Sequence, residues 1–145
     1  MKVRDVMRRP PVTVDPNASM RAAVELMKSH GVRHLPVTEQ GRLVGILTDR
    51  DIRRAAFLPL LAQQLSGVER RLQAPRVQDV MTWSVVTIDP EAELVRAGLL
   101  MFERRIGSLP VTHEGAVLGI VTERDIFEAF RAATGDVVPP EVYLG

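Results

Sequence analysis

Two short motifs each place a hydroxyl, an arginine and a carboxylate within four residues. They read Thr48-Asp49-Arg50-Asp51 and Thr122-Glu123-Arg124-Asp125. A threonine can donate or accept a hydrogen bond, an aspartate accepts hydrogen bonds from hydroxyls such as those of a ribose, and an arginine pairs with phosphate. This combination predicts binding of an anionic ligand that carries hydroxyl groups.

The same motifs have a purely structural interpretation. Each follows a predicted strand and precedes a predicted helix, so the threonine can cap the helix while the aspartate reaches back to the threonine amide. Such a cap is worth about 1 kcal/mol. Two observations favour a ligand as well. The first turn of a helix leaves amides free for phosphate, and Arg50 and Arg124 oppose the helix dipole there unless an anion offsets them.

Patterns for catalysis or metal binding are missing from the sequence. It contains no cysteine, and His30, His34 and His113 do not have the spacing of a metal site. It also lacks a glycine-rich phosphate loop ending in lysine and a Ser-His-Asp arrangement that could be placed. We therefore expect no enzyme activity, no metal and no required cofactor.

The charge balance is almost neutral. Nineteen basic and eighteen acidic residues leave a formal net charge of +1, so no overall field attracts nucleic acid or an anionic membrane. No apolar run approaches the roughly 20 residues that span a bilayer, and the charged start at residues 1–5 does not resemble a signal peptide. We expect a cytoplasmic protein. The pairs Arg8-Arg9 and Arg70-Arg71 are expected to be solvated.

The chain contains one sequence pattern twice. Asp5-Val6-Met7 aligns with Asp79-Val80-Met81 and Thr48 with Thr122, a spacing of 74 in both cases (79 − 5 and 122 − 48). The alignment needs no gap from about residue 3 to residue 52. Two copies are too few for a stacked repeat array, which predicts two similar halves that pack about a pseudo-twofold axis and share a core. Pockets at their interface should also occur in pairs.

Each copy predicts the order strand, helix, strand, strand, helix, and hence an α/β fold. β-branched runs closed by Asp-Pro predict first strands at 12–14 and 85–88. Apolar residues spaced by three and four predict a helix from residue 18 that ends at His30-Gly31. Two strands joined by a glycine turn then lead into helices that begin at Thr48 and Thr122. The expected boundaries are 1–58 and 76–132 for the two repeats, 59–75 for a partly helical connector, and 133–145 for a surface tail.

The segments Gly45–Ile52 and Gly119–Ile126 resemble the nucleotide-contacting signature of CBS domains. The Val-Met pairs before the first strands and the Leu-Pro-Val strands add to this resemblance. It implies a stand-alone CBS pair, or Bateman module, with β-α-β-β-α repeats and two related clefts that take an adenosine-containing ligand such as AMP, ADP, ATP or S-adenosylmethionine. It also implies a homodimer.

By the same resemblance, each cleft takes its Thr-x-x-Asp motif from one repeat and its adenine contacts from the other. Cleft A would comprise Thr122, Arg124, Asp125, Val12, Val32, Arg33 and His34. Cleft B would comprise Thr48, Arg50, Asp51, Val86, Ile106, Gly107 and Ser108. Because cleft A has more possible phosphate partners, we predict that it binds a multiply charged ligand more tightly.

Three functional hypotheses follow. The first is an energy or metabolite sensor in which an adenine nucleotide shifts the relative setting of the repeats, and an unknown regulated protein or the oligomer responds. The second is a structural adaptor that dimerises without ligand, its Thr-x-x-Asp motifs acting only as caps. The third, an enzyme, has the least support because the residue patterns of catalysis are missing.

Overall fold

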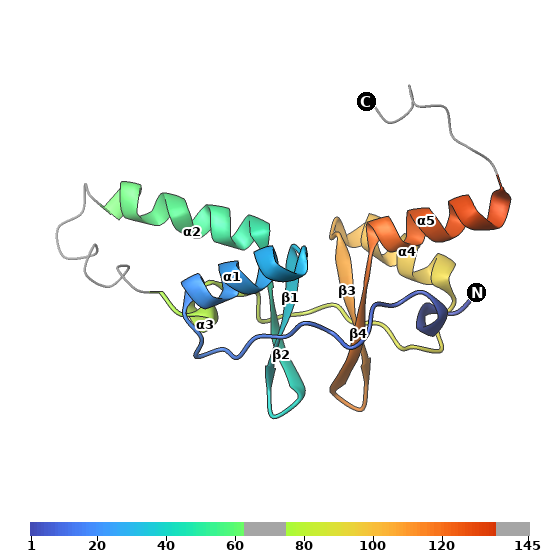
Figure 1. Ribbon diagram of the computed structural model, residues 1–145, viewed down its shortest axis with the longest axis horizontal. Helices are drawn as coiled ribbons and strands as arrows, with labels where there is room; N and C mark the ends of the chain where they lie inside the picture. Colours follow the sequence, from blue (N-terminus) through green and yellow to red (C-terminus); the bar gives the residue numbers. More distant parts are fainter. Residues whose placement is uncertain (63–74, 136–145) are drawn as a thin grey trace, which may run out of the picture.

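The computed structural model describes residues 1–62 and 75–135, and for residues 57–62 it describes the backbone only. Figure 1 shows two similar halves, each with a β-hairpin and two long helices. In sequence, the first repeat contains η1 (Val3–Asp5), α1 (Met20–His30), β1 (His34–Glu39), β2 (Arg42–Thr48) and α2 (Asp49–Ala62). The second repeat contains α3 (Val77–Val80), α4 (Leu94–Arg104), β3 (Ser108–His113), β4 (Ala116–Thr122) and α5 (Glu123–Thr134).

The four strands form one antiparallel sheet in the order β1-β2-β4-β3. The two hairpins meet where Arg42 of β2 pairs with Ala116 of β4, which are equivalent positions of the two repeats. β1 is equivalent to β3, and β2 is equivalent to β4. Each hairpin therefore has its second strand at the centre of the sheet, as a pseudo-twofold axis between β2 and β4 requires. The predicted α/β fold of two related repeats is confirmed.

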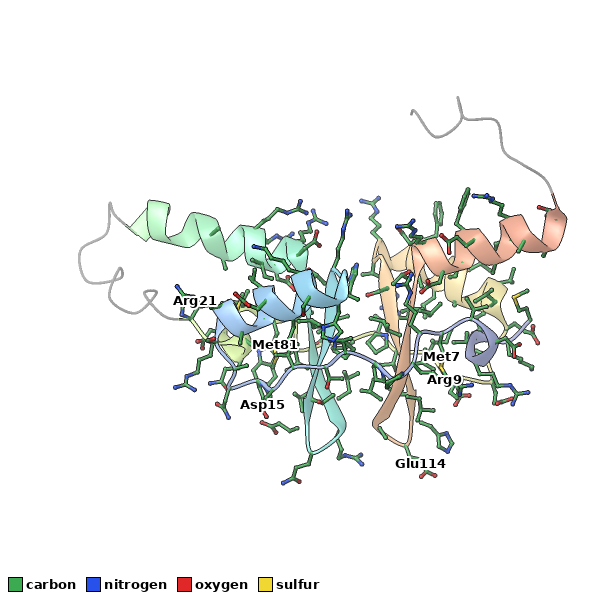
Figure 2. All side chains as sticks on the ribbon, viewed as in Figure 1. Met7, Arg9, Asp15, Arg21, Met81 and Glu114 are labelled. Atoms are coloured by element: carbon green, nitrogen blue, oxygen red, sulfur yellow. The ribbon has the colours of Figure 1, made fainter. Side chains whose placement is uncertain are left out.

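Each repeat sends its N-terminal segment to the other repeat. The Arg8 amide donates to the Ile120 carbonyl at 2.8 Å, and the Ile120 amide donates back at 3.1 Å. Thr82, the equivalent of Arg8, exchanges the same pair of hydrogen bonds with Ile46. Figure 2 accordingly shows Met7 beside the second repeat and Met81 beside the first. The exchange links the two repeats through backbone hydrogen bonds.

The two repeats share their hydrophobic core, as expected, but this core is divided into two clusters rather than one. The first cluster combines residues such as Leu35 and Leu47 with Val77 and Met81. The second combines residues such as Leu109 and Val121 with Val3 and Met7. The exchange explains the division, because each repeat completes its own core with a segment of the other.

The predicted first strands are not regular strands. Val14 forms a single parallel bridge to Val37, and Ile88 forms the equivalent bridge to Val111. The next bond of each ladder would be donated on one side by Pro36 or Pro110 and on the other side by Pro16 or Pro90, and proline has no N–H. These prolines therefore limit the pairing to one bridge.

The predicted helix starts and ends agree with the structure. Ser19 caps α1 by accepting from the Ala22 amide at 3.1 Å, and Gly31 closes the helix with φ of 62°. Glycine suits this left-handed position because it has no Cβ. α2 runs through Pro59 to Ala62, past the expected boundary at residue 58. The rest of the predicted connector and nearly all of the tail lie outside the described residues, so these boundaries stay predictions.

Candidate functional site

Both Thr-x-x-Asp motifs form complete capping boxes. The Thr122 amide donates to Asp125 Oδ2 at 2.9 Å, and the Asp125 amide donates to Thr122 Oγ1 at 3.2 Å. Thr48 and Asp51 make the same two bonds at the same distances. The structural interpretation of the motifs is therefore confirmed, and any ligand would bind beside an intact cap.

A cleft of about 390 Å³ opens where the start of β1 faces the start of α5. It brings together Val32, Arg33 and His34 of the first repeat with Thr122 and Arg124 of the second, as predicted for cleft A. Its volume lies within the range of small-molecule sites. The lining also includes residues that the sequence did not indicate for this cleft: Arg8, Gly31, Gly107, Ile120 and Glu123.

A backbone hydrogen bond within each repeat fixes the wall that the repeat contributes to the cleft. The Glu123 amide, in the first turn of α5, donates to the Gly107 carbonyl at 3.0 Å. On the equivalent side, the Asp49 amide donates to the Arg33 carbonyl at 2.9 Å. A Cβ at Gly107 would lie 3.5 Å from the His34 ring, so the ring lies against this glycine. Gly107, predicted for cleft B, therefore belongs to the lining of cleft A.

Two residues predicted for cleft A are not part of its lining. Val12 packs against the first hydrophobic cluster. Asp125 is only 7% exposed, and both of its carboxylate oxygens have partners. Oδ2 accepts from the Thr122 amide, and Oδ1 accepts from Arg8 Nε at 2.9 Å. The expectation that Arg8 is merely solvated is wrong, because the exchanged segment carries it to the opposite repeat.

Most of the residues predicted for cleft B have partners within the cap or the core. Thr48 and Asp51 form their cap, and Arg50 is exposed. Val86 and Ile106 pack against the second hydrophobic cluster. Ser108 is buried and bonded to His34 rather than open to a cleft.

The His34 ring lies between the two repeats in a partly buried position. Its Nδ1 is 2.9 Å from Ser108 Oγ. Burial lowers the pKa of His34 below its ordinary value of 6.5, with Arg33 adding to the effect and the carboxylates of Asp49, Glu123 and Asp51 opposing it. The ring is therefore neutral at pH 7. When the Ser108 hydroxyl donates to Nδ1, Nε2 carries the proton and can donate to a ligand.

Arg124 already has an anionic partner. Its Nε is 3.2 Å from Glu128 Oε1, one turn further along α5. Because Glu128 supplies a negative charge, Arg124 does not need an external anion to offset its unfavourable position in the first turn of the helix. The side chain is largely exposed, however, and exposed pairs within one helix contribute only about 0.5 kcal/mol, so Arg124 can leave Glu128 for a phosphate at little cost.

Within 1–62 and 75–135, no three histidine, cysteine or acidic side chains are grouped so that they could hold a metal ion. No helix in this part of the chain is both long and apolar enough to cross a membrane.

The repeat pattern and the paired capping boxes agree with a comparison against known families. A family described as CBS domain matches residues 3–57 and 77–132, which is more than half of the chain. The chain belongs to the CBS domain family.

Individual relatives support this assignment. The CBS domain-containing protein YhcV of Bacillus subtilis (strain 168) is 39% identical over 124 residues, covering 86% of this chain and 81% of that protein. The solved CBS domain pair of protein MJ0100, in complex with 5'-methylthioadenosine and S-adenosyl-L-methionine, matches with a TM-score of 0.77 and 30% identity, covering 92% of this chain and 98% of that one. CBSX2 in complex with AMP matches with a TM-score of 0.75 and 29% identity, covering 92% of this chain and 98% of that one.

Proposed function

We propose that this CBS pair is a regulatory sensor of adenine nucleotides and that cleft A is its main binding site. The observation that carries the proposal is the convergence of Arg8, Arg33, His34 and Arg124 on one cleft at the start of α5. Two similar CBS pairs have been solved with AMP or with S-adenosyl-L-methionine and 5'-methylthioadenosine. A ligand of that kind has the size and polarity that cleft A accommodates.

The proposed contacts follow from the chemistry of the lining. A phosphate would lie at the α5 N-terminus, where the positive end of the helix dipole and the arginines attract it. His34 would donate a further hydrogen bond through Nε2. The Thr122 hydroxyl and the Asp125 carboxylate would bind ribose hydroxyls, and adenine would contact the apolar side chains of Val32 and Ile120.

The regulatory mode follows from the position of the cleft. Its lining comes from both repeats, so a bound nucleotide connects β1 of one repeat to α5 of the other. A ligand that prefers one relative setting of the repeats shifts the population towards that setting. A separate regulated protein, or a second copy of the chain, would respond to the shift. We assign no catalytic step to the protein.

The test is calorimetric titration of the purified protein with AMP, ADP, ATP and S-adenosylmethionine. The same titrations are repeated on Asp125→Ala and Asp51→Ala. We expect micromolar binding of at least one ligand, greatly weakened in Asp125→Ala and retained in Asp51→Ala.

Asp51→Ala is a matched control for the loss of the cap, because both variants remove the same capping box from equivalent helices. Equal loss of binding in both variants would contradict the assignment to cleft A. Failure of all four ligands to bind the wild type would contradict the proposed function and favour the ligand-independent adaptor.

We further propose that the protein is a homodimer that pairs through α4 and α5. Val95, Leu99 and Phe102 lie on one face of α4, at spacings of four and three, and all are exposed, Phe102 by 82%. Phe130 is exposed on the neighbouring helix α5.

The first repeat shows that the fold does not require this apolar face. At the positions equivalent to Val95, Leu99 and Phe102, it has Arg21, Glu25 and Lys28. A second copy presenting the same two-helix face about a twofold axis would cover the apolar side chains of both chains.

A further inference from the structure

The Arg8–Asp125 ion pair links the exchanged N-terminal segment to the Thr-x-x-Asp carboxylate of α5, which lies next to the cleft A residue Arg124 in the chain. Arg8 Nε donates to Asp125 Oδ1 at 2.9 Å, and Asp125 is 7% exposed whereas the Arg8 side chain is 53% exposed. The Arg8 backbone is fixed by its two hydrogen bonds to Ile120. The buried end of the pair is therefore held in place, while the guanidinium can turn from the carboxylate towards the cleft that Arg8 also lines.

The equivalent position in the other repeat has no cation. Thr82 replaces Arg8 there, with the same backbone pairing to β2, next to the cap formed by Thr48 and Asp51. Within residues 1–62 and 75–135, Asp51 forms its two capping bonds and no ion pair. The two Thr-x-x-Asp motifs thus differ in one respect that bears on ligands: the Asp125 carboxylate has a counterion and the Asp51 carboxylate has none.

We propose that Arg8 sets the ligand preference of cleft A, so that this cleft favours adenine nucleotides bearing a phosphate over uncharged adenine nucleosides. The inference rests on the proposed function, because it assumes that an adenosine ligand occupies the cleft. It adds a selectivity residue that lies outside the Thr-x-x-Asp motif.

The selectivity arises from competition for Asp125. Its Oδ2 accepts from the Thr122 amide and its Oδ1 accepts from Arg8, and the carboxylate is only 7% exposed, so a ribose hydroxyl that binds it must displace the Arg8 guanidinium or share Oδ1 with it. A phosphate offers Arg8 a second, doubly charged partner, and the guanidinium can leave the carboxylate without losing an anion. An uncharged nucleoside offers no such partner. It must displace Arg8 into water, share Oδ1 with Arg8, or bind without the carboxylate.

The experiment compares AMP with adenosine, which differ only in the phosphate. Calorimetric dissociation constants are measured for the wild type, for Arg8→Thr, which introduces the residue found at position 82, and for Arg9→Thr. Arg9 is a matched control because it is the exposed neighbour with the same charge. We expect Arg8→Thr to weaken AMP binding by about tenfold while adenosine binding stays the same or improves. Arg9→Thr should change both by less than about twofold.

Two further variants test the charge and the position. Arg8→Lys should keep part of the AMP preference, because it retains the cation but lacks the guanidinium fork. Thr82→Arg should increase the preference of the protein for AMP, because it supplies the missing counterion near Asp51. Circular dichroism melts establish that each variant is folded.

The outcomes separate this inference from the proposed function. If the wild type binds AMP but Arg8→Thr has the same AMP-to-adenosine ratio, the selectivity role of Arg8 is wrong and the nucleotide function stands. A loss of both ligands to the same degree would assign Arg8 a structural role and equally overturn the inference. If the wild type binds neither ligand, both the inference and the proposed function are wrong.

Discussion

His34 Nδ1 and Ser108 Oγ are 2.9 Å apart, although the two residues are separated by 74 positions in the chain. That separation equals the repeat spacing, so equivalent residues of the two repeats contact each other. Ser108 is 5% exposed and His34 is partly buried. The contact therefore lies at the pseudo-twofold axis, and the difference between histidine and serine makes the two sides of this axis chemically unequal.

The first prediction concerns the pH dependence of stability. The pKa of His34 is lowered in the folded state by burial, whereas in the unfolded chain it is close to 6.5. Below about pH 6.5 the unfolded state therefore binds more protons, and the free energy of unfolding decreases as the pH falls. Above that pH the contribution of His34 is constant. Urea denaturation between about pH 5.5 and 7.5 measures the effect.

The control for this prediction is His34→Gln, which removes the titrating group, alongside His113→Gln at an exposed site. Stability should depend less on pH in His34→Gln than in the wild type, and His113→Gln should retain the wild-type slope. Identical slopes in all three proteins would show that burial of His34 does not oppose its protonation.

The second prediction concerns the capping boxes. Thr48→Val and Thr122→Val each remove a side-chain acceptor from a helix N-terminus. Each substitution should lower the free energy of unfolding by about 1 kcal/mol. Thr38→Val in β1 is a control for the same chemical change away from a cap and should alter stability by less than about 0.5 kcal/mol. Urea denaturation of the wild type and the three variants measures these changes in the free energy of unfolding. If Thr38→Val lowered this free energy as much as the other two substitutions, the caps would not have the stabilising role assigned to them.

The third prediction tests how closely the exchanged segments pack. A Cβ at Gly119 would lie 2.7 Å from the Arg8 carbonyl oxygen, and one at Gly45 would lie 2.9 Å from the Thr82 carbonyl oxygen. Neither backbone can move without breaking its pairing with the adjacent strand. Gly119→Ala and Gly45→Ala should therefore each destabilise the protein by about 1–3 kcal/mol.

Gly98 provides the matched control. It lies within α4, and a Cβ there would be 3.7 Å from Ile126, an ordinary contact. Gly98→Ala should stabilise the protein by about 0.5–1 kcal/mol, because alanine favours helix more than glycine does. Thermal melts of the three variants measure their stability. Close packing at Gly119 would be excluded if Gly119→Ala melted at the same temperature as Gly98→Ala.

The fold could be predicted from the sequence wherever a local pattern determines the structure. The caps at Thr-x-x-Asp and the end of α1 at Gly31 could be predicted because they depend on neighbouring residues. The two repeats could be predicted because comparing the sequence with itself gives a constant spacing. The prediction of regular first strands is wrong because prolines on both sides of the Val14–Val37 bridge lack the amides that would extend the pairing. Pro16 lies close to Val14 in the sequence, whereas Pro36 belongs to another strand, and its missing amide matters only once Val14 is known to lie beside it.

The site was predicted less completely than the fold. Val32, Arg33, His34, Thr122 and Arg124 could be assigned to one cleft by resemblance, and the structure brings them together. Arg8 was missed because its role depends on the exchange of N-terminal segments, which no local pattern indicates. One available signal was the difference between Arg8 and Thr82 at equivalent positions. Such differences between repeats mark the places where two similar clefts diverge.

The last prediction concerns the apolar face of α4 and α5. Phe102→Lys and Leu99→Glu introduce the residues that the first repeat has at the equivalent positions 28 and 25. Because both side chains are exposed, the substitutions should leave the fold intact while they place charges in the proposed interface. The double variant should sediment as a monomer where the wild type sediments as a dimer.

Trp83→Arg is the control for this prediction, since Trp83 is exposed outside this face and its equivalent in the first repeat is Arg9. A wild-type monomer, or a double variant that remains dimeric while Trp83→Arg dissociates, would exclude α4 and α5 as the interface.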